Sequence, residues 1–377
     1  MLKVLHIISG LNMGGAEVAL NRLITNFNDN NYCHIVVSLT KGGSIMEALK
    51  MVNVRVYEFD FKKNFIKDFF KLLVLLKNTK PDIVNTWMYH ANLIGGIAAY
   101  ILGHKRIIWS LRTTDVRKGS KILTIFIRKI SALFSYFIPK KIVCVAEAVL
   151  QAHQEIGYCK NKMIIIHNGF DASKIIFNKI ERQRLRDQFG FKSSEVIIGS
   201  VGRFNKAKDH KNFIHAAAII IKEKPNVKFL MVGKDLENDN VLINKWAKDV
   251  HVSSKLILLG ERQDISNCLS AMDIFCLHSS REGFPNSLAE AMLVGLPCIS
   301  TAVGDVEILI RDIGLMVPKE NSPALAKGLI ELIEMPSKER SLMGQKARKK
   351  IYEEFSIYDT CERYKDLYDK LLMDSKA

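Results

Sequence analysis

Short apolar runs alternate along the chain with longer stretches whose apolar residues recur every three or four positions. The runs are rich in Val, Ile and Leu and lack polar alternation, which is typical of strands buried on both faces of a parallel sheet. The stretches between them have the period of helices. The expected strands are residues 4–9, 34–39, 54–59, 82–86, 106–111, 141–145 and 163–166 in the first half, and 196–201, 227–232, 255–259, 273–277, 298–301 and 315–317 in the second.

A charged, less regular stretch (179–192) interrupts this alternation once, between the two sets of strands. A chain of 377 residues also favours two domains over one core. We therefore predict an α/β fold of two doubly wound, Rossmann-like domains, residues 1–170 and 171–354, facing a central cleft. A final amphipathic helix, within about 355–377, is expected to cross back onto the first domain.

Composition places the chain among ordinary globular proteins, with 48% hydrophobic and 25% charged residues. The seven cysteines show no C-x-x-C pairing, which favours free thiols in a reducing compartment and hence the cytoplasm. The apolar start of the chain is too short for a signal peptide and is interpreted as a strand. No apolar run reaches the length that spans a bilayer.

The formal net charge of +16 means that an anionic partner has to be considered, and the positive charge is unevenly distributed along the chain. Residues 105–141 hold ten Lys or Arg residues and one acid, Asp115, interleaved with aliphatic and aromatic residues. This pattern predicts a basic amphipathic segment on an anionic membrane surface. Nucleic acid would also accept the charge, and a solvated basic face over an ordinary core helix is the structural alternative.

Two glutamates eight positions apart flank a predicted helix start in the second domain. Pro285 suits the first turn of that helix, so Glu282 is expected in the preceding loop and Glu290 about one turn inside. The amides of residues 283–287 would lie at the positive end of the helix dipole, which suits phosphate. An ordinary helix start with incidental acids is the alternative.

Two further loops lie where strands are expected to end. Gly14 and Gly15 open the first helix and would let backbone amides approach an anion, but the pattern is not G-x-G-x-x-G, so a dinucleotide site is not favoured. Arg203 and Lys208 occupy the matching loop of the second domain, where a planar fork and a point charge would suit a diphosphate. A tight turn explains the first loop equally well when it is taken alone, and exposed charges in a polar loop are the alternative for the second.

Together these segments resemble the retaining, nucleotide-sugar-dependent glycosyltransferases of family four, which share the two-domain architecture called GT-B. The resemblance runs nearly end to end. The segments that carry it are Gly14-Gly15-Ala16-Glu17, His167-Asn168-Gly169, Gly202-Arg203 with Lys208, Glu282-Gly283-Phe284-Pro285 with Glu290, Gly295-Leu296-Pro297, and Gly304 with Glu307.

The resemblance implies roles for individual residues. Glu282 would contact the donor sugar near the reacting centre, and Glu290 would bind the ribose hydroxyls. Arg203 and Lys208 would hold the diphosphate and act in catalysis by neutralising it. The other donor-binding positions that the resemblance implies are Gly14, Gly15, Gly283, Phe284, Pro285, Asn286 and Ser287.

The resemblance also implies a reaction. A sugar would pass from a nucleoside diphosphate, UDP rather than GDP, to a growing and lipid-linked surface glycan at the inner face of the cytoplasmic membrane. Configuration would be retained by front-face attack, with a donor phosphate oxygen taking the acceptor's proton. No cofactor or metal is expected, and the sequence contains no D-x-D motif.

The chain departs from the family in one place. Many relatives carry a His after the strand expected at 106–111, where this chain has Arg112. His90 follows a neighbouring strand and is a candidate for the same cleft, although a lone His at a helix start is more often a cap or surface residue. Arg112 is a candidate for binding an anionic group of the acceptor.

Two rival functions remain open at this point. Some nucleotide-sugar 2-epimerases share the architecture, but the segments around Gly15 and Glu282 argue against that reaction. A basic, non-enzymatic module that binds nucleic acid is the other rival. The sequence shows no recognition fold for nucleic acid, so no such partner is expected.

Overall fold

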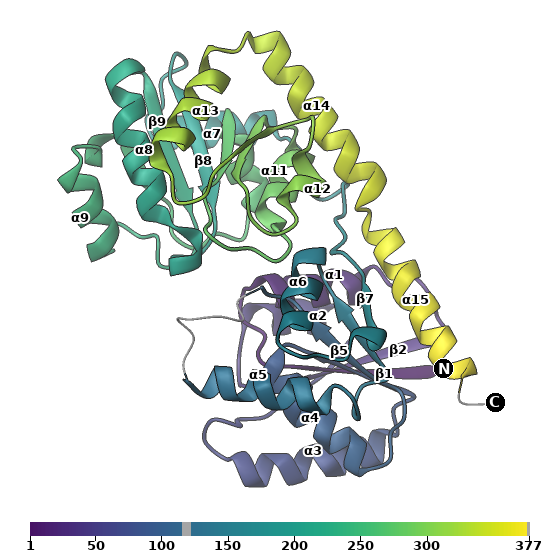
Figure 1. Ribbon diagram of the computed structural model, residues 1–377. Coiled ribbons are helices and arrows are strands. Elements are labelled where there is room, and N and C mark those ends of the chain that lie inside the picture. Colours follow the sequence, from purple (N-terminus) through teal and green to yellow (C-terminus); the bar gives the residue numbers. More distant parts are fainter. Residues whose placement is uncertain (115–121, 375–377) are drawn as a thin grey trace. The chain divides into compact units, whose positions relative to one another are not determined.

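The computed structural model describes residues 1–114 and 122–374. The chain forms two compact units (Figure 1). Unit 1 comprises Met1–Gly169 together with the chain from Ile357 onward, and unit 2 comprises Phe170–Ser356. Each unit is a parallel sheet with helices on both faces, which confirms the predicted fold class.

Unit 1 contains a seven-stranded parallel sheet in the order β3-β2-β1-β4-β5-β6-β7. Its strands are β1 (Leu2–Ile8), β2 (Tyr32–Ser38), β3 (Arg55–Glu58), β4 (Ile83–Trp87), β5 (Ile107–Leu111), β6 (Lys141–Cys144) and β7 (Met163–Ile165). Its helices are α1 (Gly15–Thr25), α2 (Ser44–Met51), α3 (Phe65–Thr79), α4 (Tyr89–Ile101), α5 (Ile122–Phe134), α6 (Glu147–Glu155) and α15 (Ile357–Met373), with a 3-10 turn at Lys160–Lys162.

Two helical layers cover the sheet of unit 1. Helices α1, α2 and α15 share one core with the sheet, while α3, α4 and α5 pack side by side on the other face. Helix α4 lies close to the strands because it presents two glycines to them. A Cβ atom at Gly95 would lie 2.8 Å from Ile7, and one at Gly96 would lie 2.6 Å from the indole nitrogen of Trp109.

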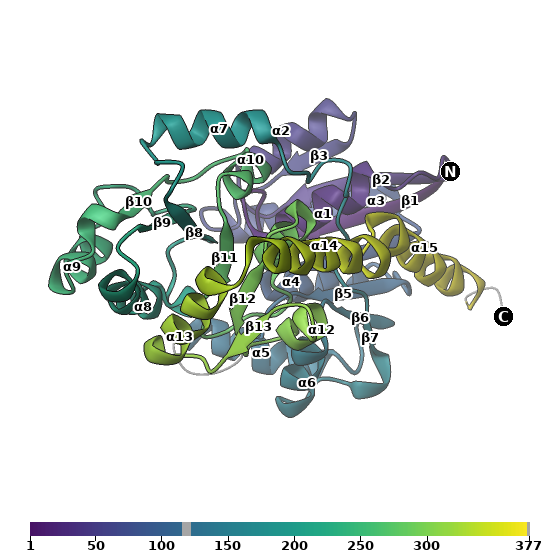
Figure 2. The ribbon, with the colours of Figure 1, turned by 90° about the horizontal axis from the view of Figure 1, so that it is seen from above.

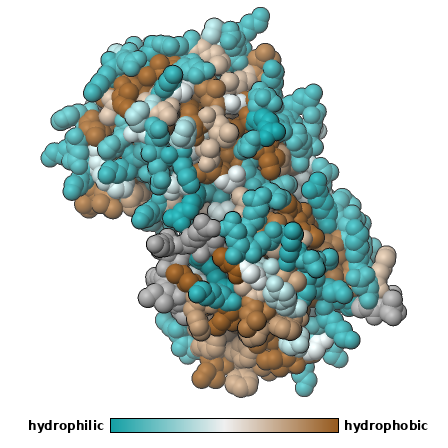
Figure 3. Space-filling model, in the orientation of Figure 1, coloured by the Kyte–Doolittle hydropathy of each residue, from teal (hydrophilic) through white to brown (hydrophobic). Residues whose placement is uncertain are grey.

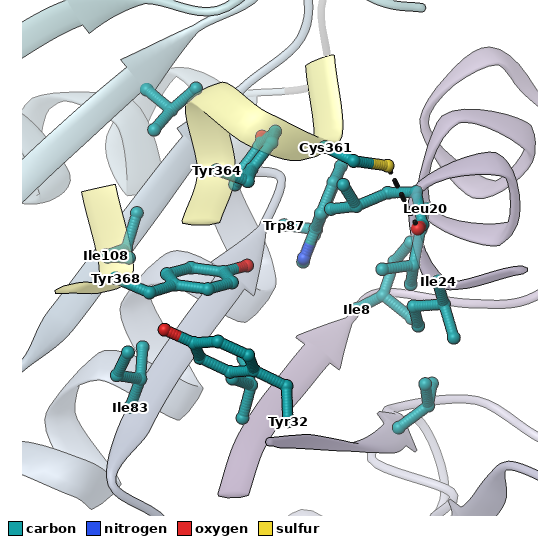
Figure 4. Close-up of a cluster of buried hydrophobic side chains, with 14 of the residues drawn as sticks. Ile8, Leu20, Ile24, Tyr32, Ile83, Trp87, Ile108, Cys361, Tyr364 and Tyr368 are labelled. Carbon is teal, nitrogen blue, oxygen red and sulfur yellow. Dashed lines mark hydrogen bonds between the residues drawn. The ribbon is translucent and has the colours of Figure 1, made fainter. Parts of the chain in front are cut away.

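The C-terminal helix α15 returns to unit 1, as predicted. Its apolar stripe is buried against α1 and the sheet, and Tyr364 and Tyr368 lie beside Trp87 and Tyr32 (Figure 4). The hydroxyl of Tyr32 also donates a hydrogen bond to Asp369, 2.5 Å away. The last helix is therefore an integral part of the first core.

Unit 2 contains a six-stranded parallel sheet in the order β10-β9-β8-β11-β12-β13 (Figure 2). Its strands are β8 (Val196–Val201), β9 (Val227–Val232), β10 (Leu256–Leu258), β11 (Ile274–Leu277), β12 (Cys298–Thr301) and β13 (Leu315–Val317). Its helices are α7 (Lys179–Gln188), α8 (His210–Glu223), α9 (Val241–Asp249), α10 (Ile265–Ser270), α11 (Asn286–Val294), α12 (Val306–Ile310), α13 (Ser322–Glu334) and α14 (Ser337–Glu354), with 3-10 turns at Lys206–Lys208 and Ser253–Lys255.

Both sheets reverse their strand order at an inner strand. In unit 1 the reversal falls between β1 and β4, and in unit 2 it falls between β8 and β11. The chain leaves such a pair of neighbouring strands in opposite directions, so the loops at their carboxyl ends diverge and leave room for a ligand. In unit 2 these are the loops that carry Lys208 and Glu282.

No helix within the described parts of the chain is both long enough and apolar enough to cross a membrane.

Candidate functional site

The loop after β8 presents Lys208 at the carboxyl edge of the unit 2 sheet. Asn205 caps a 3-10 turn by accepting a hydrogen bond from the amide of Ala207 at 2.8 Å. Gly202 leaves space for the lysine stem, because a Cβ atom there would lie 3.0 Å from Cε of Lys208. The stem is thus held against the backbone with its ammonium group at the reversal point of the sheet.

Glu282 lies in the loop after β11, directly beside Lys208. Its Oε1 accepts hydrogen bonds from Nζ of Lys208 at 2.7 Å and from the hydroxyl of Ser279 at 2.6 Å. The two charged side chains are 23% and 12% exposed, so they form a largely buried ion pair. The structure therefore brings together Lys208, which is predicted to bind the diphosphate, and Glu282, which is predicted to contact the sugar. These residues are 74 positions apart in the chain.

His278 and Ser279 support this pair and were missed by the sequence analysis. Nδ1 of His278 lies 2.6 Å from the carbonyl of Lys208, and Nε2 lies 2.7 Å from the hydroxyl of Ser200. Since a carbonyl only accepts, Nδ1 carries the proton and Nε2 accepts from Ser200. Burial lowers the pKa of His278 to about 4, so the ring stays neutral. The sequence feature that could have revealed them is the polar run at residues 278–282, which directly follows a buried strand.

A second loop fixes the backbone around Glu282. Gly304 has φ of 53°, and a Cβ atom there would lie 2.6 Å from the carbonyl oxygen of Glu282 and 2.5 Å from that of Gly283. The amide of Asp305 donates to the same Gly283 carbonyl at 3.3 Å. Only glycine combines this backbone conformation with so close an approach.

Helix α11 begins at Asn286, with Pro285 in the cap position and Glu290 in the second turn, so the predicted placement of both glutamates is confirmed. The amide of Asn286 donates to the carbonyl of Phe284 at 3.0 Å. The hydroxyl of Ser287 is buried, and no partner for it occurs among the residues that the structure describes. A phosphate oxygen at the helix start would satisfy that hydroxyl.

Two predicted donor residues differ in how much of the side chain is accessible. The ring of Phe284 is buried and packs against Phe170 and Phe355, at centroid distances of 6.1 and 5.5 Å. Its side chain is therefore buried among aromatic rings of unit 2 and is not accessible to a ligand. The side chain of Arg203 is exposed and bonds to no other described residue, so its guanidinium is available to an anion.

In unit 1, Gly14 and Gly15 begin α1 as predicted. Gly14 caps the helix with extended backbone, and a Cβ atom there would lie 2.4 Å from Oε2 of Glu17. The carboxylate of Glu17 thus folds back over the first turn of its own helix. A phosphate at the start of α1 would therefore lie beside the carboxylate of Glu17. That Gly14 and Gly15 bind the donor stays a prediction.

His90 is the second residue of α4 and has an exposed side chain. The residue before the helix, Met88, has φ of 75° and ψ of 160°, which is uncommon for a residue with a side chain. This backbone turn follows β4 at the reversal point of the unit 1 sheet. Its geometry places His90 at the edge where a ligand would bind, and a catalytic role for it remains a prediction.

Arg112 is engaged within unit 1. Its guanidinium lies 4.2 Å from the centre of the Trp87 ring and donates to Asn168 at 2.6 Å and to the hydroxyl of Tyr364 at 2.7 Å. The residue therefore links β5, the loop after β7 and helix α15. These contacts favour a structural role over binding an anionic acceptor.

The predicted basic segment 105–141 is only partly described, because Asp115, Arg117, Lys118 and Lys121 lie outside the described residues. Within the rest, Arg128 is buried, while Lys105, Lys129 and Lys140 are exposed. Four exposed apolar residues accompany them: Phe126, Leu133, Tyr136 and Phe137. Fewer positive charges of this segment therefore face outward than the ten Lys and Arg residues in its sequence would suggest.

Across residues 1–114 and 122–374, no group of three or more His, Cys, Asp or Glu side chains is arranged to hold a metal ion.

Comparison with known proteins matches both halves of the chain. Residues 13–174 match the family described as "Glycosyltransferase Family 4", and residues 181–350 match "Glycosyl transferases group 1". The structure is also similar over 98% of this chain and 100% of the other to Anabaena Alr3699/HepE, solved in complex with UDP-glucose, with a TM-score of 0.87 and 19% sequence identity.

Two curated relatives are similar over most of their length. One is the UDP-Gal:alpha-D-GlcNAc-diphosphoundecaprenol alpha-1,3-galactosyltransferase of Escherichia coli, 29% identical over 82% of this chain and 80% of the relative. The other is the capsular polysaccharide biosynthesis glycosyltransferase CapM of Staphylococcus aureus, 26% identical over 83% of each chain.

The family matches over both halves of the chain define a glycosyltransferase, and the two doubly wound units give it a two-domain fold like that of the solved structure. Within that class, this chain belongs to glycosyltransferase family 4.

Proposed function

We propose that this protein transfers a sugar from a nucleoside-diphosphate donor, UDP rather than GDP, to a lipid-linked glycan precursor, with retention of configuration. The observation that carries the proposal is the Lys208–Glu282 pair beside the start of α11, where the buried hydroxyl of Ser287 lacks a partner among the described residues. The name of the E. coli relative, which includes both UDP-Gal and a diphosphoundecaprenol acceptor, supports the donor and acceptor classes.

In this proposal Glu282 contacts the donor sugar, and Glu290 binds the ribose. Lys208 and the exposed Arg203 neutralise the diphosphate. The bond between the anomeric carbon and the phosphate oxygen breaks, and a bond forms from the same face to the acceptor hydroxyl. The acceptor's proton passes to the departing phosphate oxygen. The two cations lower the barrier by stabilising the charge that develops on that leaving group.

The reaction needs neither cofactor nor metal ion in this proposal, because Lys208 and Arg203 supply the positive charge that a divalent cation would otherwise provide.

The protein works at the cytoplasmic face of the membrane, where lipid-linked precursors are accessible. Segment 105–141 contributes exposed lysines and aromatic residues to contact with anionic lipid. Nucleic acid has no role in it.

A panel of nucleotide sugars, with and without a lipid-linked acceptor, tests the proposal. Glu282→Gln should lower sugar transfer about a hundredfold or more while leaving the fold intact, because it removes the charge that pairs with Lys208. The exposed Glu339→Gln is the matched control and should keep wild-type activity.

Three outcomes would count against the proposal. Full activity of Glu282→Gln would contradict the role of that residue, and loss of activity in EDTA would contradict metal independence. Conversion of a UDP-sugar to its epimer without acceptor would favour the rival 2-epimerase.

A further inference from the structure

Helix α3 carries an apolar stripe on the side that faces away from the unit 1 core. Asp68, Leu72 and Leu76 are buried, on the side of the helix that faces the unit. On the opposite side Ile66, Phe70 and Val74 are 73%, 63% and 57% exposed. Positions i, i+4 and i+8 form one stripe along a helix, and on a surface helix of a globular protein the outward stripe is normally polar.

The outward side of α3 is also positively charged. Residues 61–80 contain six lysines and one acid, Asp68. That acid faces inward, where its carboxylate accepts the amide of Asp60 at 2.6 Å and pairs with Lys71 at 3.1 Å. Lys67 and Lys77 are exposed on the side of the helix that carries the apolar stripe. The exposed apolar residues are thus flanked by cations, with no acid among them.

A groove lies between α3 and the edge strand β3 of the sheet. Its volume is about 610 Å³, and it is lined by Tyr57 and Phe59 from the strand side and by Lys67, Phe70, Lys71, Val74, Leu75 and Asn78 from the helix. Aromatic and aliphatic side chains thus share the groove with two lysine side chains. This combination suits a ligand with an apolar tail and an anionic head.

Exposed apolar residues also occur on the neighbouring helices of the same layer. Helix α3 packs on α4, and α4 packs on α5. Apolar residues gather in the lower part of the space-filling view, where Figure 1 shows α3 and α4 (Figure 3). Exposed apolar residues of the two neighbouring helices and the turn after α5 are Tyr100, Ile101, Phe126, Leu133, Tyr136 and Phe137.

We propose that the outward face of α3, with the groove beside β3, docks this protein on an anionic phospholipid bilayer. Ile66, Phe70 and Val74 enter the interface, and the flanking lysines contact lipid phosphates. The groove accommodates part of one anionic lipid. This inference extends the membrane setting of the proposed function to a helix that the charge count over 105–141 does not include, and it does not depend on the identity of the donor.

Flotation with vesicles of phosphatidylglycerol and phosphatidylcholine tests the docking surface. The full chain should bind them at low salt and bind phosphatidylcholine alone far more weakly. The triple variant Ile66→Ser, Phe70→Ser, Val74→Ser should bind the anionic vesicles about tenfold or more weakly, because three apolar contacts are lost. Lys67→Glu should weaken binding at low salt and have less effect at high salt.

Matched variants of unit 2 control for general effects. Val241 and Leu242 are exposed apolar residues and Lys338 is an exposed lysine. Val241→Ser with Leu242→Ser, and Lys338→Glu, should bind vesicles as the unchanged protein does. Circular dichroism and nucleotide binding of the triple variant report on folding and on the donor site, so a failed donor proposal is distinguishable from failed docking.

Three results would overturn the inference. The first is that the unchanged protein fails to float with anionic vesicles at low salt. The second is that the triple variant floats as well as the unchanged protein. The third is a dimer of the unchanged protein that becomes monomeric in the triple variant, which would assign this face to a second copy of the chain. If the triple variant is misfolded, Lys67→Glu alone decides, and unchanged binding by it at low salt overturns the inference.

Discussion

One carboxylate oxygen joins charged and polar side chains from the candidate donor site. Oε1 of Glu282 accepts hydrogen bonds from both the ammonium group of Lys208 and the hydroxyl of Ser279. Hydrogen bonds to a charged group are stronger than neutral ones, so this arrangement fixes the position of Glu282 before a ligand arrives. Because the ion pair is largely buried, removing Glu282 would leave the ammonium group of Lys208 without the carboxylate that compensates its charge.

Ser279→Ala should lower kcat/KM for sugar transfer by about tenfold, because it removes one of the hydrogen bonds that orient Glu282. Ser280→Ala is the control, since that hydroxyl lies 3.3 Å from the carbonyl of Ala207 and is not bonded to the carboxylate. Steady-state kinetics with a saturating acceptor measure the difference. Equal activities of the two variants would contradict an orienting role for Ser279.

Arg112→Lys should lower the free energy of unfolding of unit 1 by about 1–3 kcal/mol, because a lysine cannot keep two hydrogen bonds and the stacking on Trp87. Thermal or urea unfolding measures the change, and the exposed Arg55→Lys should leave it unaltered. A raised KM for the acceptor with unchanged stability would instead support the predicted role in acceptor binding.

At the scale of elements, a pair of histidines, His6 buried and His34 half-buried, connects β1, β2 and β4. The indole of Trp87 donates to Nδ1 of His6 at 3.2 Å, so Nε2 of His6 carries a proton and donates to Nδ1 of His34 at 2.9 Å. His34 therefore holds its own proton on Nε2, which is buried and has no hydrogen-bond partner within the described residues. Burial lowers the pKa of His6 well below its usual value and that of His34 to about 4.

The stability of unit 1 should therefore fall in mild acid. The histidines of the unfolded chain take up protons near pH 6.5, whereas folded His34 does so only near pH 4. Between these values the unfolded state binds more protons, so each such histidine lowers the free energy of unfolding by about 1.4 kcal/mol per pH unit as the pH falls. Urea unfolding from pH 7.5 to 5 measures this slope.

The variant His34→Gln keeps a hydrogen-bond acceptor for His6. It should lower the pH slope of the unfolding free energy by the contribution of about one proton. His153, also in unit 1, has a pKa lowered to about 4 by burial, so a residual slope is expected. The exposed His251→Asn should keep the full slope. An unchanged slope in His34→Gln would show that this histidine does not contribute.

At the scale of the whole molecule, the two units have separate hydrophobic cores and separate reversal points. Arg203, Lys208 and Glu290, which are proposed to hold the diphosphate and the ribose, lie in unit 2, whereas the predicted donor contacts of Gly14 and Gly15 lie in unit 1. A ligand stabilises the structure that binds it, by about 2.7 kcal/mol at a hundred times its Kd.

UDP should therefore protect unit 2 more than unit 1 from hydrogen exchange. We expect the largest gain at the loops after β8 and β11 and in the first turn of α11, where the amides lie next to the proposed diphosphate. The strands of unit 1 should change less, and GDP at the same concentration should have a smaller effect. Equal protection of both units, or none in unit 2, would contradict the proposed site.

Much of the fold and part of the site follow from local sequence. Buried strands and amphipathic helices differ in their hydrophobic period, so the alternation predicts two doubly wound sheets before any contact is known. Glu282 and Glu290 are also placed locally, because Pro285 and Gly295 mark the two ends of α11. The amphipathic pattern near the C-terminus predicts α15, although its return to unit 1 is a matter of topology.

Only the tertiary structure decided which side chains meet. Lys208 and Glu282 are 74 positions apart, and Arg112 and Tyr364 are 252 positions apart, so strand order and helix docking bring them together. The outward stripe of α3 could not be read from the sequence either. That helix is apolar on several sides, and a hydrophobic period cannot say which side the core will cover. Local pattern sets what each segment can form, whereas packing selects which of its faces is buried and which remains for a partner.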